Sequence, residues 1–191
     1  MGCREDSPTA GSTSMGGATS SCANTASPSP PGTRSPPSYR FLGGRKLLEV
    51  GAGTGLWAGL LSAAGASVTA VDNQSWNADA HKLMEFEYGK FYPVERLDGL
   101  EAVRRYVDHH ALMLCWPDYD ASWAGGVLEA FPGDRILYIG EGESGCTGDD
   151  RFHELLDGWL ESEVVEIPQW DGVHDDLYLY AREASCTRGR R

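Results

Sequence analysis

The sequence predicts an α/β fold in which helices cover both faces of one mostly parallel, seven-stranded sheet with an antiparallel hairpin at its C-terminal end. Three observations lead to this prediction. Short apolar segments alternate with segments of helical period along most of the chain. A glycine-rich turn joins the first strand to the first helix, as in a βαβ unit. The last two strands are separated by only nine residues, too few for a helical crossover, so they should pair antiparallel.

The first βαβ unit occupies residues 46–72. Residues 47–50 are short and mostly apolar, which is typical of a buried parallel strand. The glycine-rich turn of residues 51–55 follows, and a second strand is predicted at residues 67–71, with Asp72 at its carboxyl end. The turn is expected to bring unbonded backbone N–H groups, at a helix N-terminus, against a ligand.

The helix of this unit is predicted to place Leu56, Leu60 and Leu61 on one apolar face and to end at Gly65. Further helices are predicted at residues 76–88, 100–107, 122–131 and 152–160. Further strands are predicted at residues 91–97, 111–116, 134–139, 164–167 and 177–180. Segment 111–116 is apolar on both faces, so it should lie in the centre of the sheet.

The glycine spacing narrows the choice of ligand. A dinucleotide-binding turn G-x-G-x-x-G needs a third glycine where this sequence has Leu56, and a phosphate-binding P-loop needs a Gly-Lys-Ser/Thr that is absent. The sequence instead has Glu49-x-Gly51-x-Gly53-x-Gly55. This pattern resembles motif I of the class I S-adenosylmethionine-dependent methyltransferases, which have a Rossmann-like sheet.

The resemblance covers residues 45–182 and implies a set of cofactor-binding residues. The turn, Gly51, Ala52, Gly53 and Gly55, would let the backbone approach S-adenosylmethionine. Asp72 matches the acidic residue that holds the ribose hydroxyls, a task that suits a carboxylate because it accepts two hydrogen bonds. Asp98 matches an acid that contacts the adenine amino group, although Asp98-Gly99 also reads as an ordinary turn. Glu49 would orient the motif I loop or the methionine amino group.

The substrate side is expected in the loops after the fourth and fifth strands, since ligands bind at the carboxyl ends of parallel strands. Asp118, Tyr119 and Glu141 are the candidate catalytic residues there. In amine methyltransferases motif IV often reads Asp/Asn-Pro-Pro-Tyr, whereas residues 116–119 read Trp-Pro-Asp-Tyr and match at two positions. An amine substrate is therefore not predicted for this chain. Residues 115–156 also resemble a methyltransferase-like family with Cys-Trp-Pro-Pro-Tyr at this place.

Composition limits the other possibilities. The chain of 191 residues has a net charge of −12, which argues against non-specific nucleic-acid binding. No apolar stretch is long enough to span a membrane. Five scattered cysteines without a C-x-x-C pair indicate neither a disulfide framework nor a metal site, and they fit a reducing, cytoplasmic compartment.

The chain is divided into three parts by composition. Residues 1–38 are rich in Ser, Pro and Gly and are predicted to be disordered. They are read as a plain or regulatory tail, with an organellar transit peptide as an alternative that would direct import. The methyltransferase-like domain is predicted at residues 39–183, and residues 184–191 form a short basic tail.

Methyl transfer to an unidentified acceptor, a small molecule or a protein, is the function that the resemblance implies. Two alternatives stay open from the sequence. A non-catalytic methyltransferase-like binding module is favoured by the short segment before motif I and by the divergent motif IV. A nicotinamide- or flavin-dependent oxidoreductase on a related fold is disfavoured by Leu56.

Overall fold

The computed structural model describes residues 35–75, 89–142 and 145–182. The helices are α1 (Pro37–Leu42), α2 (Leu56–Ala63), α4 (Gly99–Arg105), α5 (Trp123–Ala130) and α6 (Asp150–Leu156). The strands are β1 (Leu47–Val50), β2 (Val68–Asp72), β3 (Val94–Arg96), β4 (Ala111–Cys115), β5 (Arg135–Gly140), β6 (Leu160–Glu166) and β7 (Asp176–Ala181). The helix predicted at residues 76–88 lies outside the described residues, as do most of the predicted N-terminal tail and the C-terminal tail.

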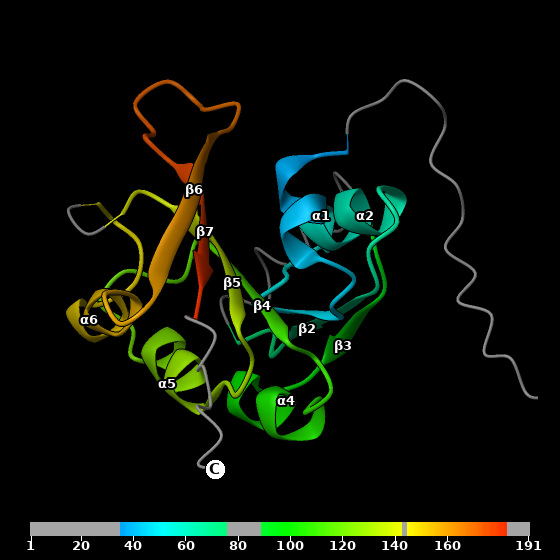
Figure 1. The fold of residues 1–191 in the computed structure, drawn as a ribbon. Coiled ribbons are helices and arrows are strands. Elements are labelled where there is room, and N and C mark those ends of the chain that lie inside the picture. Colours follow the sequence, from blue (N-terminus) through cyan, green and yellow to red (C-terminus); the bar gives the residue numbers. More distant parts are fainter. Residues whose placement is uncertain (1–34, 76–88, 143–144, 183–191) are drawn as a thin grey trace, which may run out of the picture. The chain divides into compact units, whose positions relative to one another are not determined.

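The strands form one sheet in the order β3-β2-β1-β4-β5-β7-β6. Strands β1 to β5 pair in parallel, while β7 is inserted antiparallel between β5 and β6 (Figure 1). This confirms the predicted doubly wound, mostly parallel seven-stranded sheet and its antiparallel terminal hairpin. The order reverses at β1, because β2 lies on one side of β1 and β4 lies on the other.

Helices cover both faces of the sheet, and the sheet side chains between them form two apolar layers. On one face α4, α5 and α6 pack over Leu48, Leu112 and Ile136. On the other face α1 and α2 pack over Leu47 and Met113. Strands β1 and β4 are buried along their length, as expected for the centre of a parallel sheet.

The apolar face predicted for the first helix was wrong in part. Ala58 and Leu61 are the buried residues of α2, whereas Leu56 and Leu60 are 44% and 53% exposed. Ala58 packs against Ala70 of β2. Because two alanines meet there, the helix approaches the sheet closely, and Leu56 and Leu60 lie on its exposed side.

Two other helices are shorter than predicted. Helix α4 ends at Arg105, so Val107 is exposed beyond it and lines no helix face. Helix α6 ends at Leu156, and Leu160 already begins β6 as the register partner of Ala181. The apolar spacing of residues 152–160 therefore spans a helix end and a strand start. None of the helices in the described part of the chain is long and apolar enough to cross a membrane.

Candidate functional site

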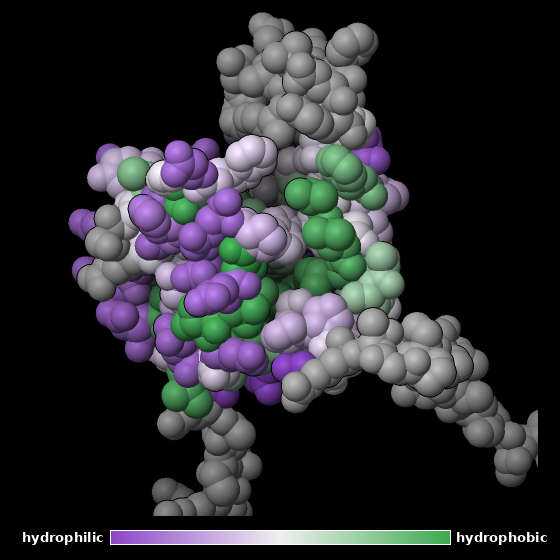
Figure 2. All heavy atoms as spheres, turned by 90° about the horizontal axis from the view of Figure 1, so that it is seen from above, coloured by the Kyte–Doolittle hydropathy of each residue, from purple (hydrophilic) through white to green (hydrophobic). Residues whose placement is uncertain are grey.

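A cleft of about 450 Å³ opens at the carboxyl ends of β1, β2 and β4, where the strand order reverses. Ligands of open α/β sheets bind at this position, because the helices that follow neighbouring strands leave to opposite faces there. Figure 2 looks onto this edge of the sheet and shows a hollow with apolar residues along one side and more polar residues along the other. The described residues that line the cleft are Val50, Gly51, Asp72, Asn73, Ser75, Leu97, Asp98, Gly99, Leu100, Cys115, Trp116, Asp118, Trp123 and Val127.

The backbone N–H groups of the glycine-rich turn are used inside the protein. Those of Gly51 and Ala52 both donate to the Val71 carbonyl at 3.0 Å, and that of Gly53 donates to Asp72 Oδ2 at 2.9 Å. The expectation of unbonded N–H groups was therefore wrong at these three residues. The end of β2 supplies their acceptors, so this part of the turn offers no cradle for a phosphate.

The glycines of the turn are required by its conformation and by close neighbours. Gly51 has φ +73°, and a Cβ atom there would lie 3.1 Å from the Trp123 ring. Gly55 has φ +79°, and a Cβ atom there would lie 2.8 Å from the Cβ of Tyr92. Both positions combine a left-handed backbone with little room for a side chain. The turn thus forms a smooth floor next to the cleft.

Asp72 is a buried carboxylate at the edge of the cleft. It ends β2 and is 3% exposed, and its two oxygens accept from the backbone N–H groups of Gly53 and Gln74 at 2.9 and 2.6 Å. Each carboxylate oxygen can accept two hydrogen bonds. Asp72 is therefore fixed in position and keeps capacity to accept further donors from a ligand.

Glu49 lies beneath the turn in β1 and does not line the cleft. Its side chain is buried, and its Oε2 has no hydrogen-bond partner within the described residues. Burial raises the pKa of Glu49 to about 8, the hydrogen bond from the Ala58 backbone opposes this rise, and the charge of Asp72 adds to it. The Glu49 side chain is thus largely protonated, and therefore uncharged, near physiological pH unless a cation approaches it.

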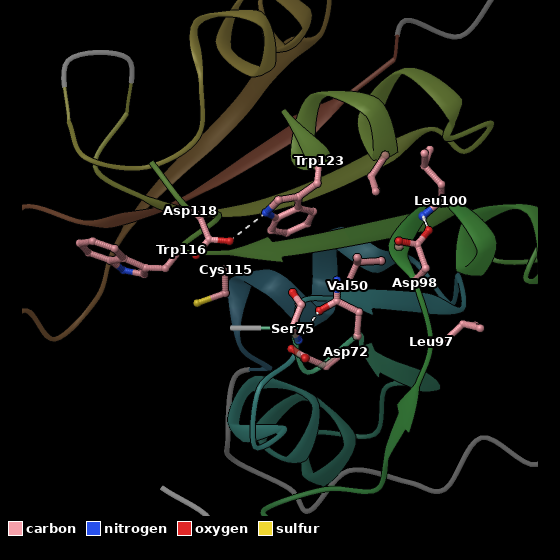
Figure 3. Close-up of a pocket in the computed structure, with 14 residues that line it drawn as sticks. Val50, Asp72, Ser75, Leu97, Asp98, Leu100, Cys115, Trp116, Asp118 and Trp123 are labelled. Carbon is pink, nitrogen blue, oxygen red and sulfur yellow. Dashed lines mark hydrogen bonds between the residues drawn. The ribbon is translucent and has the colours of Figure 1, made fainter. Parts of the chain in front are cut away.

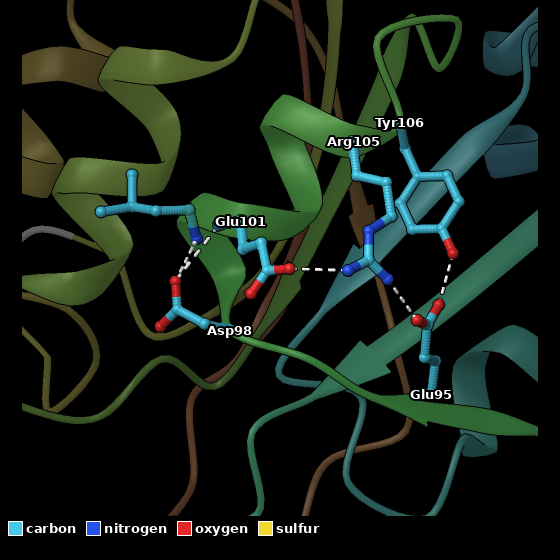
Figure 4. A network of polar contacts seen from close by, with 6 residues as sticks. Glu95, Asp98, Glu101, Arg105 and Tyr106 are labelled. Atoms are coloured by element: carbon cyan, nitrogen blue, oxygen red, sulfur yellow. Dashed lines mark hydrogen bonds and ion pairs between the residues drawn. The ribbon is translucent and has the colours of Figure 1, made fainter.

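Asp98 lies at the other end of the cleft and caps a helix. Its Oδ1 accepts from the backbone N–H groups of Leu100 and Glu101 at the start of α4. Figure 4 shows how Arg105 then bridges Glu101 and Glu95 along the outer face of this helix, at 2.6 Å to each. Because only Oδ1 is used by the cap, Asp98 serves as an N-cap and still presents its second oxygen.

Of the three predicted catalytic residues, the structure places Asp118 in the lining of the cleft and Tyr119 and Glu141 outside it. Asp118 lines the cleft, but Tyr119 is 69% exposed and is not among the lining residues. Glu141 also lies outside the lining, and its two carboxylate oxygens accept from the backbone N–H groups of Cys146 and His174. Glu141 thereby ties the loop after β5 to the loop before β7.

Two lining residues that the sequence analysis did not select are tryptophans. Trp123 begins α5, and its Nε1 donates to Asp118 Oδ2 at 2.9 Å (Figure 3). Trp116 follows β4 with φ +49°, which is unusual for a large side chain, and its Nε1 donates to Asp175 Oδ2 at 2.8 Å. Position at the carboxyl end of a central strand was the available signal for Trp116. Trp123 was expected to lie on a helix but carried no such signal.

Cys115 is the thiol of the cleft. Burial, together with the negative charges of Glu49 and Asp175, raises the pKa of Cys115 to about 12. The thiol is therefore protonated at neutral pH and is a poor nucleophile. Among the residues that the structure describes, no group of three or more His, Cys, Asp or Glu side chains is arranged to hold a metal ion.

No protein-family model matches the sequence, and comparison with curated proteins found no significant match. Solved structures do match the fold. The 1,6-didemethyltoxoflavin-N1-methyltransferase of Burkholderia thailandensis, solved with its substrate and S-adenosylhomocysteine, has a TM-score of 0.50 at 16% identity, over 76% of this chain and 75% of that one.

A second structure, the PH0226 protein of Pyrococcus horikoshii, has a TM-score of 0.50 at 10% identity, over 73% of this chain and 82% of that one. The magnesium protoporphyrin IX methyltransferase of Synechocystis, solved with bound S-adenosylmethionine, has a TM-score of 0.47 at 12% identity, over 73% and 71% of the two chains. The strand order of the sheet, its reversal at β1 and the likeness to the Burkholderia structure all indicate the same fold. This chain has the fold of the class I S-adenosylmethionine-dependent methyltransferases.

Proposed function

We propose that this chain binds S-adenosylmethionine in the cleft at the ends of β1, β2 and β4 and transfers its methyl group to an acceptor. The observation that carries the proposal is Asp72, a buried carboxylate fixed by two backbone N–H groups at the edge of the cleft. A cis-diol donates two hydrogen bonds, and Asp72 retains acceptor capacity on both oxygens.

The surrounding residues fit the other parts of this cofactor. Leu97 and Leu100 give an apolar wall beside Asp98, suited to a flat base with an amino group. Glu49 offers a buried oxygen without a partner beneath the turn, which suits the approach of an ammonium group. The backbone N–H groups of residues 51–53 are used inside the protein and offer no phosphate cradle, and the proposed cofactor has no phosphate. This also disfavours the nicotinamide and flavin alternative, whose dinucleotides need one.

Bound in this cleft, the cofactor would supply a methyl group already activated by the sulfonium charge. The protein then has to orient that group and exclude water from it. Asp72 and Asp98 would hold the nucleoside, while the glycine floor of residues 51–55 allows close approach. Asp118 is the lining carboxylate nearest in sequence to the end of β4. Its carboxylate would accept a hydrogen bond from an N–H or O–H group of the methyl acceptor.

Calorimetric titration of the full-length chain with S-adenosylmethionine tests the proposal. We expect saturable binding to the wild-type protein. Asp72→Ala should weaken it at least tenfold, a loss of about 1.4 kcal/mol or more, because the diol loses a charged acceptor. Asp72→Asn keeps one acceptor oxygen and the approximate shape, so it should give a smaller loss.

Asp157→Ala is the matched control. Asp157 follows α6, is exposed and does not line the cleft, so its loss should leave the affinity unchanged. Circular dichroism of each variant checks the fold. Absence of binding to folded wild-type protein would refute the proposal. Binding that persists unchanged in Asp72→Ala would contradict the assigned site. Binding without methyl transfer to any acceptor tested would favour the binding-module alternative.

A further inference from the structure

The two tryptophans of the cleft share a feature: each indole N–H is bound to a carboxylate. Trp116 Nε1 donates to Asp175, and Trp123 Nε1 donates to Asp118. In Figure 3 the ring of Trp123 stands beside Asp118 above Val50. A hydrogen bond from the N–H to an anion increases the electron density of the ring, so its face becomes more negative. Such a face attracts cations.

The charges around the cleft have one sign. Among the described residues that line it, the charged side chains are Asp72, Asp98 and Asp118, all acidic. Asp175 lies close enough behind the lining for its charge to contribute to raising the pKa of the Cys115 thiol. Asp175 is only 8% exposed, and its Oδ1 has no partner among the described residues. Among the lining residues that the structure describes, no lysine or arginine compensates these carboxylates.

We infer that the cleft binds a positively charged ligand in preference to a neutral ligand of the same shape, and that Trp123 and Asp118 carry this preference. The inference rests on the proposed function, because the cofactor and its product differ by this charge. Methyl transfer breaks the S–CH₃ bond, leaves the electron pair on sulfur and forms a bond from the methyl carbon to the acceptor. The sulfonium becomes a neutral thioether, so the product loses the attraction and leaves more readily.

Three ligands measure the preference in the full-length protein by calorimetry. S-adenosylmethionine should bind about threefold to thirtyfold more tightly than S-adenosylhomocysteine, the range that one cation–π contact supplies. Sinefungin, in which an amine replaces the sulfonium methyl, is cationic at pH 7 and should bind with an affinity close to that of S-adenosylmethionine. The third ligand shows whether the preference requires the sulfonium itself or only a positive charge at that position.

Two variants locate the preference. Asp118→Asn keeps an oxygen acceptor for the Trp123 N–H and removes only the charge, so the affinity ratio should fall at least twofold with the fold intact. Trp123→Leu should lower the ratio further because the ring face is lost. Trp170→Leu is the control, since Trp170 is 84% exposed and does not line the cleft. Its ratio should equal that of the wild type.

The outcomes separate the two proposals. A wild-type ratio of one or less, with both ligands bound, would overturn the inference and leave the proposed function standing. A ratio that stays unchanged in both Asp118→Asn and Trp123→Leu would also overturn it. If none of the three ligands binds the folded protein, the proposed function fails, and the inference fails with it.

Discussion

Asp72 shows how a single residue obtains its position from several parts of the chain. It ends β2, and backbone groups from the turn before α2 and from the loop after β2 hold its two oxygens. The acid at the end of the second strand was predicted from the sequence because strand ends of parallel sheets meet at one edge. Its burial and its two fixed bonds depend on how the turn folds back, which no spacing in the sequence specifies.

Glu49 gives a prediction at the same scale. Its pKa is raised from 4.5 to about 8 in the folded chain. Between these values the folded state holds a proton that the unfolded state has released, so the contribution of Glu49 to stability is fully present below pH 4.5 and is lost as pH rises towards 8. The free energy of unfolding should decrease by roughly 2–4 kcal/mol across this range because of Glu49.

Urea denaturation of the wild type and of Glu49→Gln at pH 5 and pH 8 checks this. Glutamine has nearly the same volume and no charge, so the variant should lose less stability than the wild type between the two pH values. Equal losses in the two proteins would show that Glu49 does not contribute to the pH dependence.

A small number of specific contacts hold the turn before α2 and the helix α4 in place next to the cleft. The turn before α2 leaves almost no space at Gly55, where Tyr92 and Val94 from the β3 side pack against the backbone. Helix α4 is set by the Asp98 cap at one end and by the Arg105 bridges along its side. These contacts fix the position of α2 and α4 on either side of the cleft.

Gly55→Ala should therefore destabilise the protein. The added methyl group would meet Tyr92 at 2.8 Å, and alanine is strained at φ +79°. We expect a loss of about 2–3 kcal/mol in the free energy of unfolding, measured by thermal or urea denaturation. Gly172→Ala is the comparison, because that glycine has φ +80° but open space around it, so the backbone term alone remains. A Gly55→Ala loss no larger than that of Gly172→Ala would contradict the steric account.

Helices and strands were predicted correctly from the sequence where a segment is buried along its whole length. The prediction was wrong where the end of a helix lies close to the start of a strand. Strands β1 and β4 are buried on both faces, so their apolar runs identify them directly. Leu160 matched a helical spacing but begins a strand, since periodicity does not show where a helix stops. Trp123 and Trp116 were missed because their role comes from carboxylates that fold beside them, one of them 59 residues away.

At the scale of the whole molecule, charge is divided between the two edges of the sheet. The described residues that directly follow β1, β2, β4 and β5 contain aspartate and glutamate but neither lysine nor arginine, while Arg96 ends β3 as the register partner of Asp72. Arg45 and Lys46 lie at the opposite edge, where they pair with Asp134 and Asp108. A cation approaching the cleft is thus attracted by the near edge and meets few repulsive charges there.

This division predicts a salt effect. S-adenosylmethionine has a net charge of +1 at pH 7, so raising ionic strength from 10 to 150 mM should weaken its binding about threefold, since the screening length falls from about 30 to 8 Å. S-adenosylhomocysteine has no net charge and should be nearly unaffected. Calorimetry of both ligands at the two salt concentrations checks this, and equal salt dependence would contradict steering by the acidic edge.

The contact between Trp116 and Asp175 also has a consequence for synthesis of the chain. Trp116 follows β4, whereas Asp175 comes immediately before β7, the strand that inserts between β5 and β6. During translation the Trp116 side chain, which lines the cleft, therefore lacks its hydrogen-bond acceptor until the loop before the final strand has emerged and docked. A ribosome-bound chain that stops before residue 175 has the glycine turn and Asp72 but leaves the Trp116 indole without its carboxylate. The position of Trp116 would thus be fixed in a late step, when β7 closes the sheet.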